Sequence, residues 1–99
     1  MSQALILEFK DATADQYEAV DRVLGLDPHT GEGDWPDGLL HHIGTASDRS
    51  GVVVMEVWDS QESHGTFMAS RLGPALDKVG LPEPTRVEWL PILGEHHVS

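Results

Sequence analysis

Short apolar runs alternate with polar segments along this chain, and their order predicts four strands. The runs span residues 4–9, 39–45, 52–58 and 86–92, and each is rich in Val, Leu, Ile or aromatic side chains. Runs of this length and composition are typical of strands rather than helices. Only the polar segment 46–51 joins the second run to the third, so we expect these two strands to form a β-hairpin.

An amphipathic helix is predicted after the first strand. It begins with a capping box, in which Thr13 and Gln16 bond each other's backbone N–H groups, and it ends at Gly25, a residue suited to a left-handed helix end. Its apolar stripe consists of Tyr17, Val20, Val23 and Leu24.

A second helix is predicted after the third strand, where residues 59–62 form another cap. Gly73 and Pro74 interrupt its apolar pattern. Because proline has no N–H and its ring collides with the preceding turn, we expect a kink there or two short helices.

The order β-α-β-β-α-β indicates a ferredoxin-like α+β fold over residues 1–99, as a single domain. In this fold a four-stranded antiparallel sheet carries both helices on one face. The predicted strands, however, are apolar on both sides, whereas a sheet with one wet face alternates apolar with polar residues. We therefore expect the uncovered face to pack against a second copy of the chain, forming a homodimer.

Strand alternation assigns side chains to the two faces of this sheet. One set is expected to face the helices: Leu5, Leu7, Phe9, Val53, Met55 and Val57. The opposite set is expected to face the interior between the two sheets: Ile6, Glu8, Val54, Glu56 and Trp58.

Composition narrows the function classes further. Six Lys and Arg stand against 17 Asp and Glu, a formal net charge of −11, which argues against a nucleic-acid partner. The absence of cysteine excludes disulfides, thiolate metal sites and a cysteine nucleophile. No apolar run is long enough to cross a membrane, and the N-terminus lacks the basic residues of a signal peptide. We expect a cytoplasmic protein with no membrane partner.

Residues 56–63, EVWDSQES, followed by RLGPAL at residues 71–76, resemble the dimeric α+β barrel superfamily, which includes the antibiotic biosynthesis monooxygenases. The resemblance implies a homodimer that binds a small molecule, with Trp58 as a wall of the pocket. The superfamily includes oxygenases without cofactors, haem-degrading enzymes, polyketide cyclases and isomerases. Haem degradation does not fit, because Glu8, Phe67 and Asp77 stand where that branch has Asn, Trp and His.

A small set of polar residues is the predicted site. Glu8, Glu56 and one of the adjacent His41 and His42 are expected on one buried face, with His42 favoured as a base. Two carboxyls and an imidazole in apolar surroundings push each other's pKa values apart, which suits proton abstraction from an acidic phenol or a 1,3-dicarbonyl carbon. The predicted substrate-binding residues are Trp58, His41, Trp35, Arg71 and His64.

The segment 26–38 is the longest predicted loop and is rich in Gly, Pro and acids. Trp35 at its centre either closes over the pocket as a lid or pins the loop to the domain. Its acids do not have the spacing of a calcium-binding loop, and we expect no metal and no cofactor.

The favoured hypothesis is therefore an enzyme without a cofactor, which abstracts a proton from an aromatic or polyketide-like substrate. Among such enzymes, an oxygenase is the first hypothesis and a cyclase or isomerase is the second. The competing hypothesis is a dimer of the same fold that binds a small molecule without catalysis.

Overall fold

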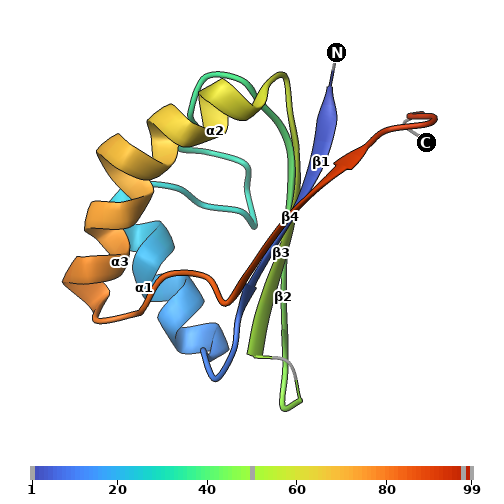
Figure 1. Cartoon of the computed structure of the whole chain (residues 1–99). Coiled ribbons are helices and arrows are strands. Elements are labelled where there is room, and N and C mark those ends of the chain that lie inside the picture. The colour runs from blue at the N-terminus through green and yellow to red at the C-terminus, as the bar shows by residue number, and fades with distance from the viewer. Residues whose placement is uncertain (1, 50, 97, 99) are drawn as a thin grey trace.

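One antiparallel sheet with helices on a single side forms the framework of this chain (Figure 1). The structure is a computed structural model, and it describes residues 2–49, 51–96 and 98. Its elements in chain order are β1 (Gln3–Phe9), α1 (Ala14–Leu24), β2 (Leu39–Ser47), β3 (Gly51–Trp58), α2 (Gln61–Phe67), the π-helical turn η1 (Met68–Leu72), α3 (Gly73–Val79) and β4 (Arg86–Pro91). The sheet order β2-β3-β1-β4, with every neighbouring pair antiparallel, confirms the ferredoxin-like prediction.

Local signals place the helices as predicted. The capping box of Thr13 and Gln16 is formed at the start of α1, and Gly25 ends the helix with a φ of 75°. Ser60 caps α2 by accepting a hydrogen bond from the Ser63 N–H. The interruption before Pro74 takes the form of the π-helical turn η1, where the Gly73 N–H bonds the Met68 carbonyl five residues back.

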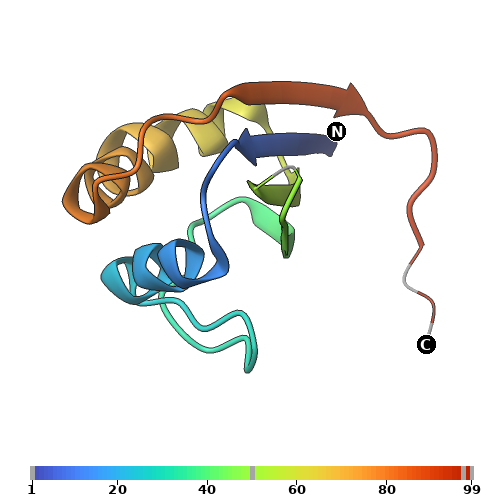
Figure 2. The same cartoon turned by 90° about the horizontal axis from the view of Figure 1, so that it is seen from below.

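The core lies between the sheet and the helices, as Figure 2 shows from below. The first helix packs against α3, so the helices form one layer over the sheet. The buried apolar side chains are Leu5, Leu7, Phe9, Ala12, Val20, Leu26, Val52, Val54, Trp58, Phe67, Leu72, Ala75 and Leu76.

The structure corrects the predicted facing of β3. Leu5 pairs with Glu56 and Leu7 with Val54, so Val54, Glu56 and Trp58 point toward the helices together with the β1 core residues. Val53, Met55 and Val57 point the other way. Because β3 is apolar on both sides, alternation alone does not distinguish its two faces, and the pairing with β1 decides.

The first helix differs from the prediction at one position. Asp21 is buried, with 7% of its surface exposed, whereas Val23 is 41% exposed. The stripe that faces the sheet is centred on Tyr17, Val20, Asp21 and Leu24, which are spaced three, four and seven residues from the first. A carboxylate therefore occupies the place of a core residue.

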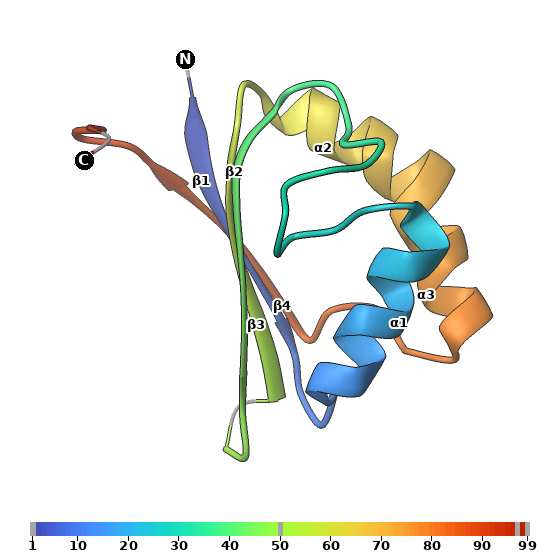
Figure 3. The same cartoon turned by 180° about the vertical axis from the view of Figure 1, so that it is seen from behind.

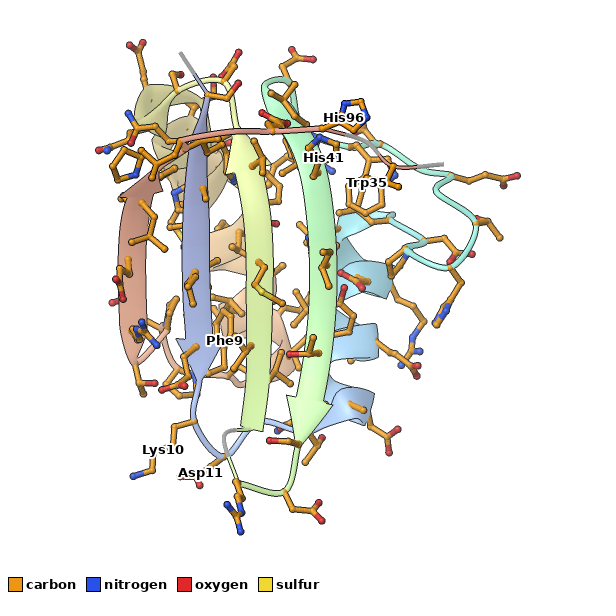
Figure 4. The ribbon with its side chains drawn as sticks, turned by 90° about the vertical axis from the view of Figure 1, so that its right-hand side faces the viewer. Phe9, Lys10, Asp11, Trp35, His41 and His96 are labelled. Carbon is orange, nitrogen blue, oxygen red and sulfur yellow. The ribbon has the colours of Figure 1, made fainter. Side chains whose placement is uncertain are left out.

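The sheet face opposite the helices carries no covering layer in the described part of the chain (Figures 3 and 4). Its apolar side chains come from all four strands: Ala4, Ile6, Ile43, Val53, Met55, Val57 and Leu90. Ile43 is 54% exposed and Met55 is 40% exposed. This apolar face is the one that the sequence predicts to be covered.

Candidate functional site

An apolar cavity of about 50 Å³ lies between the sheet and the helices. Core side chains line most of it, and the polar groups on its wall are Tyr17, Asp21, Trp35, His42 and Glu56. A water molecule needs roughly 10–15 Å³ by the same kind of measure. The cavity therefore has room for a few waters or a small part of a ligand, and a larger ligand requires movement of its walls.

Four polar side chains, three of them on this wall, form a continuous hydrogen-bonded line. The Trp58 indole N–H donates to Glu56 Oε1 at 2.9 Å. Glu56 Oε2 lies 2.7 Å from His42 Nδ1, and His42 Nε2 lies 2.5 Å from the Tyr17 hydroxyl. The side chains of His42 and Glu56 are 12% and 6% exposed. This line of Trp58, Glu56, His42 and Tyr17 is called the buried relay below.

Donors and acceptors fix the direction of the buried relay. The Glu56 carboxylate can only accept, so it takes the indole N–H of Trp58 and the Nδ1–H of His42. In neutral His42 the other nitrogen, Nε2, then has no hydrogen and accepts the Tyr17 hydroxyl proton. A proton arriving at Nε2 would make an imidazolium paired directly with Glu56.

Asp21 adjoins the far end of this line. Its carboxyl lies close to the Tyr17 hydroxyl, while its Oδ2 atom is buried with no hydrogen-bond partner among the described residues. Burial is the largest effect on Asp21 and raises its pKa to about 6, although the nearby His42 opposes the rise. Burial and the Asp21 charge also raise the pKa of Tyr17, which keeps its hydroxyl protonated at neutral pH.

Simple features of the backbone bring these groups together. Tyr17 and Asp21 lie one turn apart on α1, and His42 pairs with Glu56 across β2 and β3. Glu56 and Trp58 are two residues apart on one strand, so both point inward. A bulge between Leu39 and His41 sets the facing of the two histidines.

Glycine at position 44 makes room for the tyrosine. A Cβ atom added to Gly44 would lie 2.4 Å from Cζ and the hydroxyl oxygen of Tyr17, closer than side-chain contacts allow. The Tyr17 ring therefore rests directly on the backbone of β2. This contact holds its hydroxyl beside the imidazole of His42.

The structure brings together only part of the predicted catalytic set. His42 and Glu56 are in contact, but on the sheet face that the helices cover and not on the opposite face, where the sequence analysis placed the site. Glu8 points to the opposite face of the sheet, where it pairs with Val53 and Arg86, because it alternates with the inward Leu7 and Phe9. The predicted pairing of Glu8 with Glu56 is therefore wrong.

His41 lies on the uncovered face, where it bonds Glu95 of the C-terminal segment at 3.0 Å. Figure 4 shows His41 and His96 at the end of this face that the segment crosses. His41 therefore lies outside the cavity.

The other predicted substrate-binding residues differ in their surroundings. Trp58 is fully buried and supports Glu56 without lining the cavity. His64 is buried between the rings of Trp58 and Trp89, at 5.3 and 5.5 Å between centroids, and burial lowers its pKa. His64 therefore lies in the core and does not line the cavity.

The loop 26–38 contributes two of its residues to the cavity, Leu26 and Trp35. Trp35 lines it, with its ring 5.4 Å from that of His42, and its indole N–H donates to the Gly31 carbonyl. Arg71 donates to the Leu24 carbonyl at 2.9 Å and lies 3.7 Å from the Asp34 carboxylate, so it ties the loop and α1 to η1. Arg71 does not line the cavity.

The sequence interpretation missed the roles of Tyr17 and Asp21. It treated Tyr17 as a core residue of α1 and left Asp21 out. A signal was present, since Asp21 stands four residues after Tyr17 and next to Val20, on the stripe that the helix buries. An acid on such a stripe indicates a buried carboxyl that needs a partner.

The described residues contain no group of three or more His, Cys, Asp or Glu side chains that could hold a metal ion. Within the described part of the chain, no helix has both the length and the apolar character needed to span a membrane.

Comparisons with solved structures support the fold. A protein from Chloroflexus aurantiacus described as an antibiotic biosynthesis monooxygenase matches at a TM-score of 0.65 and 20% identity, with all of both chains covered. Rv0793 from Mycobacterium tuberculosis matches at 0.65 and 23% identity, over 98% of this chain and 100% of the other.

A monooxygenase from the gene ActVA-Orf6 of Streptomyces coelicolor, solved with the ligand nanaomycin D, matches at a TM-score of 0.57 and 20% identity, over 99% and 92% of the two chains. No model of a protein family and no curated protein matches the sequence. The chain thus has the ferredoxin-like fold of antibiotic biosynthesis monooxygenase-like structures.

Replacing Gly44 with alanine should push the Tyr17 ring off β2. We expect Gly44→Ala to lower the free energy of unfolding by about 1–3 kcal/mol, as overpacking does. Gly65→Ala is the control, because Gly65 lies in α2 with open space around it. This variant should raise the free energy of unfolding by about 0.5–1 kcal/mol. Urea denaturation measures both, and equal stability of Gly44→Ala and the wild type would show that Tyr17 does not rest on Gly44.

Replacing Asp21 with asparagine should stabilise the fold at neutral pH. Its pKa rises from 3.8 to about 6 on folding, so between these values the folded state binds more protons than the unfolded state. Stability contributed by this group is therefore lost as pH rises from about 4 to 6.

We expect Asp21→Asn to raise the free energy of unfolding by on the order of 1–3 kcal/mol at pH 7. We also expect the stability of this variant to change less between about pH 4 and pH 6 than that of the wild type. Asp15→Asn, an exposed position on the same helix, should stay within about 0.5 kcal/mol of the wild type. Urea denaturation from pH 4 to 8 makes the measurement. If Asp21→Asn is less stable than the wild type at pH 7, favourable interactions of the Asp21 carboxylate outweigh the cost of its burial, and the prediction is wrong.

Proposed function

We propose that this chain is a small-molecule enzyme that works without a bound cofactor on an aromatic or polyketide-like substrate, beginning with proton abstraction. The observation that carries the proposal is the buried relay on the wall of an apolar cavity. An apolar cavity with a few convergent polar groups is the usual form of a small-molecule site. The nanaomycin D bound to a structure of the same fold is consistent with a ligand of this class.

The relay provides a destination for an abstracted proton. When an acidic O–H or C–H bond of the substrate breaks, its electron pair stays on the substrate and its proton passes toward His42 Nε2. The resulting imidazolium is stabilised by Glu56, which is itself held by Trp58. Low polarity around the cavity strengthens this ion pair.

An oxygenase remains the favoured reaction class, with dioxygen as the second substrate of the deprotonated intermediate. A cyclase or isomerase shares the same first step and differs only in what the intermediate attacks. The small volume of the cavity favours the other alternative, a dimer that binds a small molecule without catalysis. We also retain cytoplasmic location as part of the proposal, since the chain has no cysteine.

Replacing Glu56 with glutamine tests the relay with little change in shape. The glutamine oxygen can still accept from Trp58, but its NH2 group must donate to His42 Nδ1, which moves the imidazole proton to Nε2. Nε2 then cannot accept a proton. We expect Glu56→Gln and His42→Ala to reduce turnover at least about 100-fold, the lower range for a general base.

Turnover is measured by mass spectrometry over a panel of aromatic phenols and 1,3-dicarbonyl compounds, together with oxygen uptake. Glu8→Gln is the matched control, because Glu8 lies on the other face of the sheet. Oxygen uptake separates an oxygenase from a cyclase or isomerase. If both site variants only unfold the protein and no compound protects it against heat, the catalytic hypothesis is lost.

We further propose that the uncovered sheet face is the interface of a homodimer. The face presents apolar side chains from all four strands, and an exposed apolar patch of this kind marks an association site. Two copies related by a two-fold axis would each bury the same residues.

A charge placed within this apolar face should separate the two copies. The wild type is expected to sediment at twice the chain mass of 10.8 kDa, and Ile43→Glu as the single chain. Val23→Glu adds the same charge on the exposed side of α1 and should leave the dimer intact. A wild type that sediments only as a 10.8 kDa species at micromolar concentration would refute the dimer.

A further inference from the structure

The buried relay leaves His42 no nitrogen free to meet a ligand. Nδ1 is occupied by Glu56 at 2.7 Å, and Nε2 is occupied by the Tyr17 hydroxyl at 2.5 Å. Glu56 is likewise engaged by Trp58 and His42 through its two oxygens. A proton from a ligand in the cavity therefore needs another first acceptor.

Asp21 has the free acceptor atom. Its side chain lines the cavity, the residue is only 7% exposed, and its Oδ2 has no partner among the described residues. Leaving a buried polar atom unpaired destabilises the folded state, and more so when the group is charged. Such an atom, on a residue that lines the cavity, is accounted for if a ligand supplies the missing donor.

The charges on the cavity wall also favour a ligand that donates a hydrogen bond. The cavity wall contains the carboxyls of Asp21 and Glu56, whereas no Lys or Arg lines it. An anionic ligand would be repelled by both carboxylates and would find no cation to pair with. A neutral ligand with one O–H or N–H group meets neither obstacle.

We propose that Asp21 Oδ2 is the atom that accepts the ligand's hydrogen bond and then its proton, so that the site selects neutral ligands carrying an O–H or N–H donor. This inference rests on the proposed function, because it identifies the group through which the substrate reaches the buried relay. It also differs from the sequence interpretation, in which His42 and Glu56 met the substrate directly.

The proton transfer balances within these residues. The ligand O–H or N–H bond breaks, its electron pair stays on the ligand, and the proton makes Asp21 a neutral carboxylic acid. The Asp21 carboxyl then turns, so that Oδ2 donates this proton to the Tyr17 oxygen while the Tyr17 hydroxyl proton moves to His42 Nε2. At the end Asp21 is again a carboxylate, Tyr17 is unchanged, and the imidazolium of His42 is paired with Glu56.

Three small probes of similar shape test the selectivity. They are 4-fluorophenol, which has an O–H donor, 4-fluorotoluene, which has none, and 4-fluorobenzoate, which is an anion. Fluorine NMR titration of the wild type at pH 7 gives the three dissociation constants. We expect 4-fluorophenol to bind about tenfold more tightly than 4-fluorotoluene, since a hydrogen bond to a charged group contributes roughly 1.5–3 kcal/mol, and 4-fluorobenzoate to bind most weakly.

Variants assign this preference to Asp21. Asp21→Leu keeps the size of the side chain without an acceptor, and it should bind 4-fluorophenol no better than 4-fluorotoluene. Asp21→Asn keeps an acceptor oxygen without the charge and should retain part of the preference. Asp15→Leu, at an exposed position on the same helix, should behave like the wild type.

The outcomes separate this inference from the proposed function. A preference for 4-fluorophenol that survives in Asp21→Leu would overturn the role of Asp21 and leave the cavity as a ligand site. If the wild type binds the three probes with equal affinity, the role of Asp21 is likewise overturned, and the cavity remains a ligand site. If no probe binds the folded wild type, the cavity is not a small-molecule site, and the proposed function fails as well.

Discussion

A buried carboxylate held by two donors organises the site of this protein. Glu56 accepts one hydrogen bond from Trp58 and one from His42, while its side chain is 6% exposed. A buried charge is tolerated only when it is paired and hydrogen-bonded, so neither donor can be lost without a large cost. His42 on β2 lies opposite Glu56 on β3, and the hydrogen bond between them fixes the ring of His42. The position of Tyr17 and the shape of the polar wall follow from it.

Asp21 differs from Glu56 because its pairing is incomplete. One carboxyl is engaged on both oxygens, and the other has a buried oxygen without a partner among the described residues. The fold therefore gives up stability at Asp21 that an asparagine would restore at neutral pH. Natural proteins give up stability in this way mainly at sites where a group is needed for function. The two acids of one cavity thus differ in whether a buried oxygen is left without a partner.

Much of the fold could be predicted from residue patterns because the signals are local. The capping box of Thr13 and Gln16, the left-handed Gly25 and the helix interruption before Pro74 depend on neighbours within a few residues. The candidate site could be predicted only in part. The contact of His42 with Glu56 was within reach of the sequence. The facing of β3 was not, since this strand is apolar on both sides, and Glu56 was therefore grouped with Glu8 although the two lie on opposite faces of the sheet.

The sequence by itself determined the order of the elements, the ferredoxin-like arrangement and the presence of acids within apolar segments. Only the tertiary structure decided which of those acids share a cavity. The pairing of β1 with β3 set the facing of Glu56, and the bulge beside His41 set the facing of His42. The packing of α1 on the sheet then placed Tyr17 and Asp21 against them. Facing and register depend on contacts between distant segments, and no local pattern encodes them when both faces of a strand are apolar.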